Sequence, residues 1–362
     1  MKNKLKKFFR NKKVIVTGHT GFKGSWLALW LKMLGAKVLG VSNSIPSSPS
    51  HFNSIKLSKK INHKKMDIRD IRKLKALFRS YKPDYVFHLA AQSLVKRSYD
   101  DTLYTWQTNT IGTINVLESL RVVKKNCVAV IITSDKSYKN LELKRGYHEN
   151  DLLGGKDPYS ASKASAELAI SSYISSFMSS KKNKLRIGIA RAGNVIGGGD
   201  WSEDRLVPDC VKAWSKSKKV MLRNPYSTRP WQHVLEALRG YLILATKLKN
   251  NKNLHGEAFN FGPRHNFEKN VVSLVKEMKK HWVSVNWSIS KNKKYYESKL
   301  LKLNSNKAKK ILKWSCTLNF KETIELVTLW YKNFYRKKEN SFYYSKKQII
   351  DYEKKIKNAK KS

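Results

Sequence analysis

The chain of 362 residues carries 74 Lys and Arg against 26 Asp and Glu, a formal net charge of +48, and 41% of its residues are hydrophobic. This apolar content excludes a globally disordered protein, and the length favours one large α/β lobe with a smaller lobe attached to it. The basic residues are scattered along the chain, so we expect a basic solvated surface and no specific nucleic-acid partner.

The first residues and the cysteines indicate the compartment. Residues 1–12 form a basic extension, and the apolar run that follows them is too short for a signal peptide. The apolar segment 26–31 is far shorter than a membrane-spanning helix. We therefore expect a cytoplasmic protein without a membrane partner. Three cysteines that lie far apart predict no disulfide framework and no metal site: Cys127, Cys210 and Cys316.

Short apolar runs alternate with longer amphipathic stretches through the first half of the chain. Continuous apolar runs of this kind fit strands that are covered on both faces, with helical crossovers between them. The pattern predicts a doubly wound parallel Rossmann sheet. The runs lie at residues 14–16, 38–41, 85–89, 128–132 and 187–190, and the first crossover helix is expected over about 22–34.

The second half of the chain has shorter elements and scattered prolines. We expect residues 13–196 to hold mainly the Rossmann domain and residues 197–335 mainly a smaller C-terminal α/β substrate-binding lobe, with some interleaving of the two. The Lys-rich residues 336–362 are expected to form either a docked terminal helix or a solvated tail. Further helices are expected near 205–215, 234–249 and 322–335.

The segment TGHTGFKG, residues 17–24, follows the first strand and opens the first helix. Glycines at this point let the chain turn tightly and approach a pyrophosphate, which the backbone N–H groups of the helix N-terminus then face. In this strand–turn–helix context the motif predicts a nicotinamide dinucleotide site. Its expected cofactor-binding residues are Gly18, His19, Thr20, Gly21, Phe22, Lys23 and Gly24.

The adenosine end of the cofactor is expected beside the second and third strands. Ser42 or Asn43 stands where a dinucleotide site usually has an acid, and no Arg follows there to receive a second phosphate. The choice between NAD and NADP therefore stays open at this position. Asp67 and Ile68 are placed to meet the adenine edge, and helix capping by Asp67 or Asp70 is a compatible interpretation.

The run HLAAQ, residues 88–92, ends the fourth strand with small residues that let the backbone come close to the cofactor. Leu89, Ala90 and Ala91 are expected to contact it, whereas His88 is expected to be a packed strand residue.

A second helix start lies at DPYSASK, where Asp157 suits the cap and Pro158 the first helical position. Tyr159 and Lys163 are four residues apart and share a helix face. A nearby ammonium stabilises a phenolate and lowers its pKa, so Tyr159 can take the hydroxyl proton of an alcohol as hydride leaves the same carbon. The alternative is an ordinary Tyr and Lys on a helix surface, which the Rossmann pattern disfavours.

These motifs, with Asn109 and the segment YSASK, resemble the extended short-chain dehydrogenase/reductase family over residues 12–335. More narrowly, the segments TSDKSY, RGYHENDLLGGKDPYSASK, RAGNVIGGGDW and STRPWQHV resemble the CDP-glucose 4,6-dehydratases. The resemblance implies NAD as the cofactor, with Asn109, Tyr159 and Lys163 among its binding residues. It also implies a CDP-hexose substrate and a homodimer formed through two long helices of the Rossmann half.

By the same resemblance, Ser134 holds the carbon-4 hydroxyl of the hexose beside Tyr159, and Asp135 gives a proton to the hydroxyl that leaves carbon 6. Lys136 stands where dTDP-glucose dehydratases commonly have the Glu that removes the proton at carbon 5. A Lys can serve as a base only if burial or a nearby cation lowers its pKa well below the solution value. Lys136 is therefore expected either to be the base or to position Asp135.

Four residues are expected to bind the substrate: Gln92, Asn194, Arg205 and Arg229. The family places the segment of Asn194 against the sugar and its diphosphate, and the planar guanidinium of Arg229 suits a phosphate. Arg205, in SEDRLVPD, is a further candidate.

Two alternatives remain open. One is another sugar-nucleotide enzyme of the same fold, a 4-epimerase or a dehydratase acting on a UDP-, GDP- or dTDP-hexose. An epimerase needs the ketone at carbon 4 but no acid at the position of Asp135. The other is a non-catalytic Rossmann protein that binds RNA, which the charge suggests but which has no need of Tyr159, Lys163 and Asp135 together.

Overall fold

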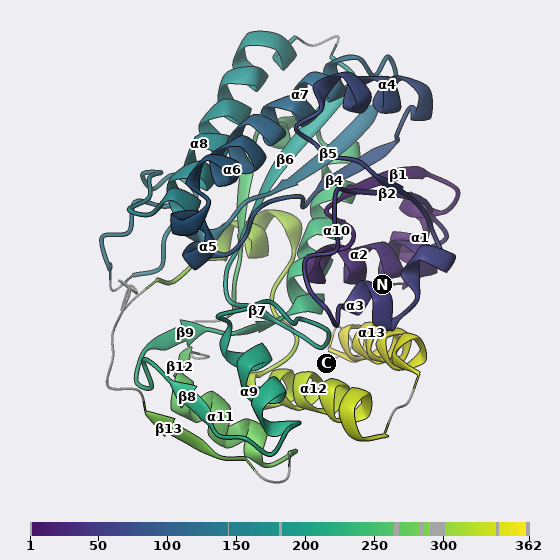
Figure 1. Ribbon diagram of the computed structural model, residues 1–362. Coiled ribbons are helices and arrows are strands. Elements are labelled where there is room, and N and C mark those ends of the chain that lie inside the picture. The colour runs from purple at the N-terminus through teal and green to yellow at the C-terminus, as the bar shows by residue number, and fades with distance from the viewer. Residues whose placement is uncertain are drawn as a thin grey trace.

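The computed structural model describes residues 2–143, 145–180, 183–263, 268–282, 285–289, 301–337 and 340–359. Its centre is a seven-stranded sheet in the order β11-β6-β5-β4-β1-β2-β3, and every neighbouring pair is parallel (Figure 1). The predicted doubly wound Rossmann sheet is thereby confirmed. The strands are β1 Lys13–Thr17, β2 Lys37–Ser42, β3 Asn62–Lys65, β4 Tyr85–His88, β5 Cys127–Ile132, β6 Leu185–Ala192 and β11 Ala258–Phe261.

Helices cover both faces of this sheet because consecutive strand residues point to opposite sides. Val14 and Val16 pack into one hydrophobic core, and Ile15 between them packs into the other. The first face carries α2 (Phe22–Met33) and α10 (Val234–Asn250), with α1 (Lys2–Phe9) against α10. The second face carries α4 (Ile71–Tyr81), α7 (Gly112–Arg121) and α8 (Pro158–Tyr173).

Shorter helical segments link these elements. They are α3 His51–Ser54, η1 Leu57–Lys59, α5 Val95–Asp100, α6 Thr102–Trp106, η2 Gln107–Ile111, η3 Asp135–Ser137, η4 Ile174–Met178, η5 Lys252–Leu254, η7 Ala308–Leu312 and η8 Asn333–Lys337.

The second lobe lies below the carboxyl ends of the strands in Figure 1. It holds three two-stranded sheets, in which β7 pairs with β10, β9 with β12 and β8 with β13. The chain does not stay in this lobe, because α10 and β11 return to the Rossmann layer, as the expected interleaving after residue 197 allowed. The lobe's elements are β7 Val195–Ile196, α9 Leu206–Trp214, β8 Val220–Leu222, β9 Thr228–Pro230, β10 Gln232–His233, β12 Glu268–Asn270, α11 Val271–Lys279, β13 Trp287–Ile289 and α12 Phe320–Lys332.

Both ends of the chain pack against the Rossmann lobe. The basic N-terminal extension forms α1, whose Leu5 and Phe9 are buried. The Lys-rich C-terminal stretch forms α13 (Ser341–Asn358), so the docked helix is the correct alternative for these residues. Residues 338, 339 and 360–362 of that stretch lie outside the described residues.

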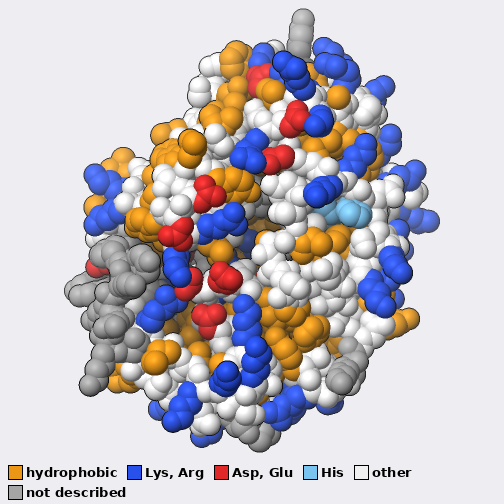
Figure 2. Space-filling view, viewed as in Figure 1, with side chains coloured by type: hydrophobic (Ala, Val, Ile, Leu, Met, Phe, Trp, Pro, Cys, Tyr) orange, Lys and Arg blue, Asp and Glu red, His pale blue; other side chains and the backbone are white. Residues whose placement is uncertain are grey.

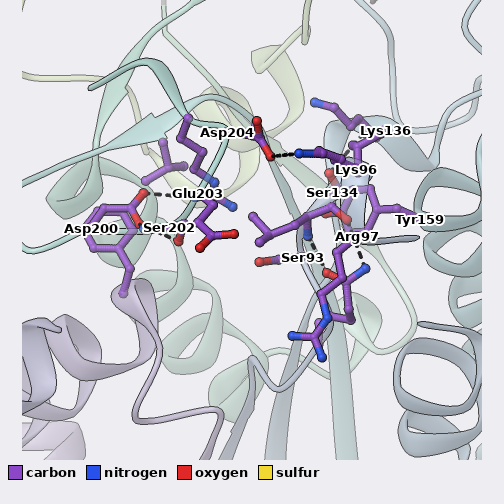
Figure 3. Close-up of a pocket in the computed structure, with 18 of the residues that line it drawn as sticks. Ser93, Lys96, Arg97, Ser134, Lys136, Tyr159, Asp200, Ser202, Glu203 and Asp204 are labelled. Atoms are coloured by element: carbon purple, nitrogen blue, oxygen red, sulfur yellow. Dashed lines mark hydrogen bonds and ion pairs between the residues drawn. The ribbon is translucent and has the colours of Figure 1, made fainter. Parts of the chain in front are cut away.

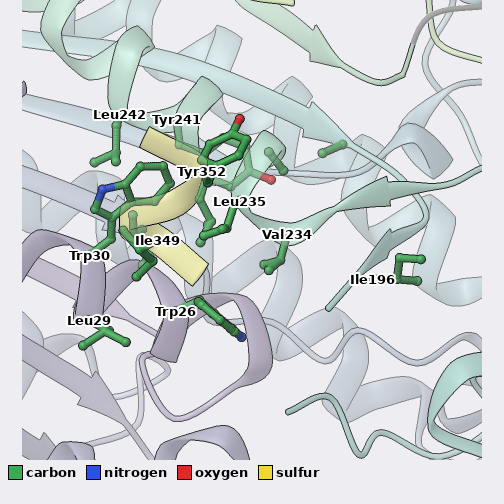
Figure 4. Close-up of a cluster of buried hydrophobic side chains, with 14 of the residues drawn as sticks. Trp26, Leu29, Trp30, Ile196, Val234, Leu235, Tyr241, Leu242, Ile349 and Tyr352 are labelled. Carbon is green, nitrogen blue, oxygen red and sulfur yellow. The ribbon is translucent and has the colours of Figure 1, made fainter. Parts of the chain in front are cut away.

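The contact of α13 with α2 is both apolar and polar. Ile349 and Tyr352 of α13 lie beside Trp30 of α2 and the side chains of α10 (Figure 4). The indole N–H of Trp30 donates to Glu353 Oε1 at 2.9 Å, and the Ser345 hydroxyl lies 3.1 Å from His51 Nε2. The last helix therefore completes the packing of the first crossover helix.

Candidate active site

A cleft of about 1750 Å³ opens between the two lobes at the carboxyl ends of β1, β2, β4, β5 and β6. This edge is where ligands bind in doubly wound sheets. Figure 2 shows the hollow near the centre of the molecule, with acidic and basic side chains at its rim. In the part of the chain that the structure describes, no cluster of His, Cys, Asp or Glu could hold a metal ion, and no helix has the length and apolar character to cross a membrane.

The glycine turn after β1 forms the floor of this cleft. Gly18 has a φ of +73°, and a Cβ there would lie 2.6 Å from the backbone nitrogen of Ala90. A Cβ on Gly24 would lie 2.1 Å from the carbonyl oxygen of Gly18. Both positions therefore require glycine, and the turn presents bare backbone to the cleft at the start of α2. Thr20, Gly21, Phe22 and Lys23 complete this lining.

His19 belongs to the same motif but does not line the cleft. It is fully buried, and its Nδ1 lies 3.1 Å from the Ser42 hydroxyl. Burial lowers the pKa of His19 to about 4, so the ring is neutral. His19 thus supports the turn from below rather than facing a ligand.

Lys23 is a partly buried cation, a property that the motif alone did not reveal. Its ammonium forms no ion pair within the described residues, although the cleft also holds Asp135, Asp200 and Arg205 nearby. Burial lowers the pKa of Lys23 to about 8, Arg205 lowers it further, and the two carboxylates oppose this. An unpaired cation on a phosphate-binding turn fits an anionic ligand.

The end of the cleft beside β2 and β3 is lined by Ser42, Asn43, Asp67 and Ile68, which were expected to meet the adenosine part of the cofactor. Asn43 Nδ2 donates to Asp67 Oδ2 at 3.1 Å. Asp67 thus places a carboxylate beside the end of β2, where the strand has no acidic residue of its own. Arg69 Nη2 donates to the same carboxylate at 2.8 Å. The segment after β2 holds no Arg, as the sequence shows, and Arg69 comes instead from the segment that follows β3, the neighbour of β2.

The end of β4 is held to the helix of Tyr159 by Asn109. Leu89, Ala90, Ala91 and Gln92 line the cleft, whereas Asn109 lies behind them and is fully buried. Asn109 Nδ2 donates to Gln92 O and to Ser162 Oγ, both at 2.9 Å. His88 is buried between Thr17 and Thr113, which confirms it as a packed strand residue.

Tyr159 and Ser134 meet across the cleft wall. Asp157 accepts the Ser160 backbone N–H at 2.9 Å and Pro158 begins α8, so Tyr159 lies in the first turn of that helix. Burial raises the pKa of the Tyr159 phenol to about 12, while a hydrogen bond with Ser134 opposes this rise. Figure 3 shows Ser134, Lys136 and Tyr159 grouped on one side of the cleft, facing the loop of Asp200.

Lys163 lies behind Tyr159 and outside the cleft lining. Its Nζ donates to Ile132 O at 3.4 Å. Burial lowers the pKa of Lys163 to about 7, Lys23 lowers it further, and Glu167 opposes both. The expectation that the Lys163 charge lowers the pKa of the phenol is wrong for this state, because burial dominates both groups.

Asp135 and Lys136 differ sharply in burial. Asp135 is 1% exposed, and its Oδ1 accepts the Ser134 hydroxyl at 3.0 Å. Its Oδ2 is buried without a hydrogen-bond partner among the described residues. Lys136 Nζ lies 3.7 Å from Asp135 Oδ1 and its side chain is 35% exposed. Lys136 is thus partly exposed and forms an ion pair with the buried Asp135.

Gly193, at the end of β6, makes room for Asp135. A Cβ at this position would lie 1.7 Å from Asp135 Oδ2. No side chain other than hydrogen fits there unless the carboxylate moves. This spatial requirement gave no signal in the sequence.

The second lobe supplies the remaining expected residues, and all three line the cleft: Asn194, Arg205 and Arg229. Asn194 has a φ of +48°, and its Nδ2 is buried without a partner among the described residues. Arg205 Nη1 lies 3.1 Å from Asp200 Oδ2, and Arg229 Nη1 donates to Thr228 O at 2.8 Å. Polar groups from the segment after β6, the start of α9 and β9 thus line the same cleft.

An ion pair crosses the mouth of the cleft. Lys96 of α5, in the Rossmann lobe, lies 3.4 Å from Asp204 Oδ2 in the second lobe (Figure 3). Arg223 Nη2 lies 3.4 Å from the other oxygen of the same carboxylate. Sequence reasoning missed this ion pair, because Lys96 and Arg223 belong to no motif and Asp204, in SEDRLVPD, had no assigned role.

Comparison with known proteins places this architecture among sugar-nucleotide enzymes. Residues 15–327 match the family model described as GDP-mannose 4,6 dehydratase. A CDP-glucose 4,6-dehydratase of Salmonella typhimurium is 42% identical over 351 residues, which cover 96% of this chain and 98% of that protein. A UDP-glucose 4-epimerase of Mycoplasma genitalium is 26% identical and covers 89% of this chain and 97% of its own length.

Solved structures share the fold. An epimerase of Methanothermobacter thermautotrophicus superimposes with a TM-score of 0.79 at 24% identity, covering 93% of this chain and 98% of that one. A dTDP-glucose 4,6-dehydratase of Bacillus anthracis, solved in complex with NAD, has a TM-score of 0.73 at 20% identity and covers 89% of this chain and 97% of its own.

Proposed function

The chain belongs to the GDP-mannose 4,6-dehydratase family, within the extended short-chain dehydrogenases/reductases, and we propose that it is a CDP-glucose 4,6-dehydratase. One observation carries the proposal. Tyr159, Ser134 and the buried acid Asp135 share one wall of a single cleft whose floor is a glycine turn. Ketone formation alone needs the first two of these groups, and elimination of water needs the third.

NAD fits the floor of the cleft. The cradle formed by Gly18 and Gly24 admits a phosphate against bare backbone, and the unpaired ammonium of Lys23 complements its charge. We propose that Asp67 and Ile68 meet the adenine end. The bound dinucleotide supplies the chemistry of accepting a hydride from carbon 4 and returning it to carbon 6. Because a dehydratase regenerates its cofactor in each turnover, the net reaction is loss of water.

Tyr159 starts the reaction in this proposal by taking the proton of the carbon-4 hydroxyl. Its pKa of about 12 must fall for this step, and the groups that can lower it are Ser134, which is hydrogen-bonded to the phenol, and Arg205. Ser134 also donates to Asp135 at 3.0 Å. The phenol and the carboxyl are therefore joined through one hydroxyl.

Asp135 gives its proton to the hydroxyl that leaves carbon 6, and the ketone at carbon 4 acidifies the proton at carbon 5. Lys136 accepts that proton once the substrate covers its side chain, and it returns the proton to carbon 5 after water has left. After these steps Tyr159 has gained one proton and Asp135 has lost one. Transfer of a proton from Tyr159 to Asp135 therefore restores the starting state of both residues. The contacts of Ser134 with both groups provide the route for this transfer.

We propose that Lys136 is the partner of Asp135 before the substrate binds and a base only afterwards. The support is its 35% exposure and the 3.7 Å between its ammonium and Asp135 Oδ1. The base role at carbon 5 requires the substrate to cover this side chain and remove it from water.

The nucleotide and its diphosphate are proposed to lie along the second lobe. Asn194 offers an unpartnered buried amide, and Arg205 and Arg229 offer guanidinium groups that suit phosphate oxygens. Gln92 lines the opposite wall. The support for a cytidine nucleotide is the 42% identity to the Salmonella enzyme over nearly the full length of both chains.

We further propose a cytoplasmic homodimer. Four apolar side chains on α6, η2, α8 and η4 are exposed: Leu103 by 70%, Leu168 by 62%, Phe177 by 54% and Ile111 by 48%. These helices flank the second face of the sheet, where the family resemblance places the dimer contact. The three cysteines are buried and form no disulfide among the described residues, as a reducing compartment favours.

The test is turnover by the purified protein of CDP-, UDP-, GDP- and dTDP-glucose with NAD. The expected result is a 4-keto-6-deoxy product, detected by its absorbance in base, from the CDP sugar. A product from the dTDP sugar alone would assign a different dehydratase, and interconversion of hexose epimers without that absorbance would assign a 4-epimerase. Salt-dependent binding of random RNA without turnover of any sugar would favour the non-catalytic alternative.

A further inference from the structure

A buried ion pair lies directly beneath the turn that carries Ser134, Asp135 and Lys136. Glu167 of α8 and Arg191 of β6 are 2% and 3% exposed. Arg191 Nε lies 2.9 Å from both carboxylate oxygens of Glu167, and Arg191 Nη2 lies 2.5 Å from Oε2. The comparison of motifs did not single out either residue.

The carboxylate of Glu167 is bonded to both ends of that turn. Thr133, just before Ser134, donates its hydroxyl to Glu167 Oε1 at 2.6 Å. Ser137, just after Lys136, has its hydroxyl 3.0 Å from the same oxygen. The three residues between these two anchors are the proposed catalytic triplet.

Arg191 holds the next residue of the same segment. Its Nη1 donates to the Tyr138 hydroxyl at 2.6 Å and to Glu149 O at 2.8 Å. Tyr138 in turn donates to Asn260 Oδ1 at 2.8 Å, on the neighbouring strand β11. The network therefore extends from α8 through β6 to β11 and is bonded to the turn at Thr133, Ser137 and Tyr138.

Glu167 also connects this turn to the helix of the phenol. Tyr159, Lys163 and Glu167 are spaced four residues apart on α8, so they follow one helix face. The Glu167 charge acts on Lys163, whose pKa it helps to keep from falling further. One carboxylate therefore fixes the acid Asp135 and the phenol Tyr159 relative to each other.

Packing alone does not explain why a charged pair is used at this point. Desolvation of two buried charges offsets much of their attraction, and apolar side chains of similar volume stabilise a fold at least as well. A bidentate Arg–carboxylate pair adds a fixed geometry that apolar contacts do not provide.

We propose that Glu167 and Arg191 are positioning residues, which set the distance and orientation of Asp135 relative to Tyr159 for the elimination step. This inference rests on the proposed dehydratase reaction. Oxidation at carbon 4 uses Tyr159 and Ser134 close to the helix, whereas elimination needs Asp135 aligned with carbon 6 at the same time. Loss of the pair should therefore slow elimination more than oxidation.

The experiment compares Glu167→Gln with Glu236→Gln, which alters the chain's other described buried Glu–Arg pair, away from the cleft lining. The wild-type protein is measured first, so an incorrect function appears as absence of product before any variant is compared. For Glu167→Gln we expect kcat for the 4-keto-6-deoxy product to fall about 10- to 100-fold, with a KM within about threefold of wild type. Partial reduction of bound NAD on adding the sugar should persist. Glu236→Gln should keep wild-type kcat per folded molecule.

A second pair of variants covers the case in which Glu167→Gln does not fold. Thr133→Val removes the hydroxyl bonded to Glu167 without changing the charge of the network, and Thr133→Ser restores that hydroxyl. We expect Thr133→Val to lose elimination relative to NAD reduction and Thr133→Ser to recover it. Equal kcat per folded molecule in the Glu167 and Glu236 variants, or wild-type elimination by Thr133→Val, would overturn the proposal.

Discussion

Two buried Glu–Arg pairs in this protein have similar chemistry and different surroundings. The carboxylate of Glu167 contacts side-chain hydroxyls of the turn that lines the cleft. The carboxylate of Glu236 accepts the backbone N–H groups of Thr317 and Leu318, both at 2.7 Å, and lies 2.5 Å from the Tyr352 hydroxyl. The first pair therefore holds the turn of Ser134, Asp135 and Lys136, and the second joins α10 to the C-terminal segment.

The comparison shows that burial of a charge does not by itself indicate catalysis. Perturbed and buried ionisable groups gather both at sites and in structural networks. The partners of the buried charge distinguish a functional network from a structural one. Bonds to backbone N–H groups indicate a role in folding, whereas bonds to side chains that line a cleft indicate a role in its chemistry. Four experiments test this distinction.

The largest effect is expected for Asp135→Asn. Removing the proton that Asp135 donates should lower formation of the 4-keto-6-deoxy product by about 10²- to 10⁴-fold. Partial reduction of bound NAD by the sugar nucleotide should remain, because Tyr159 and Ser134 are intact. Stopped-flow absorbance of the reduced cofactor, with product assayed in base, separates the two steps. Equal loss of both steps would count against the assigned role of Asp135.

Glycine substitutions next to each pair come second. Gly193→Ala places a methyl group 1.7 Å from Asp135 Oδ2, so the carboxylate must move and kcat should fall about 100-fold. Gly240→Ala places one 2.4 Å from Phe261 Cδ1, so it should lower the free energy of unfolding by about 1–3 kcal/mol and leave turnover per folded molecule unchanged. Urea denaturation and steady-state kinetics on both variants measure this. The distinction fails if Gly193→Ala keeps full activity.

The third change is Glu236→Gln, which breaks the structural pair. Arg239 is left buried without its counter-charge, so we expect a loss of about 3 kcal/mol in the free energy of unfolding. Tyr352→Phe, which removes only one hydroxyl from the same network, should cost about 1 kcal/mol. Chemical denaturation monitored by fluorescence gives both values, and the reverse order would show that Glu236 is not the centre of this network.

The smallest effect concerns pH. Burial lowers the pKa of Lys163 to about 7, below the value of about 10.4 in an unfolded chain. Between these values the unfolded chain binds more protons, so this group makes the ligand-free protein more stable as pH rises from 7 towards 10. Lys163→Met should flatten the rise in denaturation midpoint between pH 7 and 9. Burial also lowers the pKa of Lys23, to about 8, so Lys23→Met should flatten the same rise by a smaller amount. An unchanged slope in Lys163→Met would contradict the lowered pKa.

Local patterns were sufficient for the central fold. The apolar runs predicted β1, β2, β4, β5 and β6 to within a few residues, and the glycine turn predicted the start of α2 at Phe22. Elements without such a pattern were either expected without a range, as β3 was, or missed, as β11 was. β3 is an exposed edge strand of sequence NHKK, and β11 is four residues long and lies far along the chain from its partner β6.

The sequence of the C-terminal helix contains a helical spacing of buried residues that was overlooked because the segment is rich in lysine. Ser345, Ile349, Tyr352 and Ile356 recur at spacings of four, three and four residues, and all are buried. This is the spacing of one helix face, but the surrounding lysines suggested a solvated tail. Here the apolar period was more informative than the charge.

The candidate site also contains residues that the sequence predicted and residues that it did not. Motif residues such as Gly18, Ser134, Asp135 and Tyr159 line the cleft where their motifs placed them, while their biological roles stay predictions. The partners that support them come from distant segments: Arg191 reaches Glu167 across the sheet, and no spacing rule relates the two. Burial and charge balance, which set the pKa values of Tyr159 and Lys163, also depend on the whole fold.

The seating of α13 on α2 has a consequence for biosynthesis. The helix that starts at the glycine turn is made before α13, and Trp30 finds its hydrogen-bond acceptor, Glu353, only after a further 323 residues have been made. Until then an indole N–H and a broad apolar surface stay exposed on the nascent chain, a state prone to aggregation. The Rossmann lobe therefore completes its packing only after α13 has been made, and we expect chaperone dependence to fall on α2.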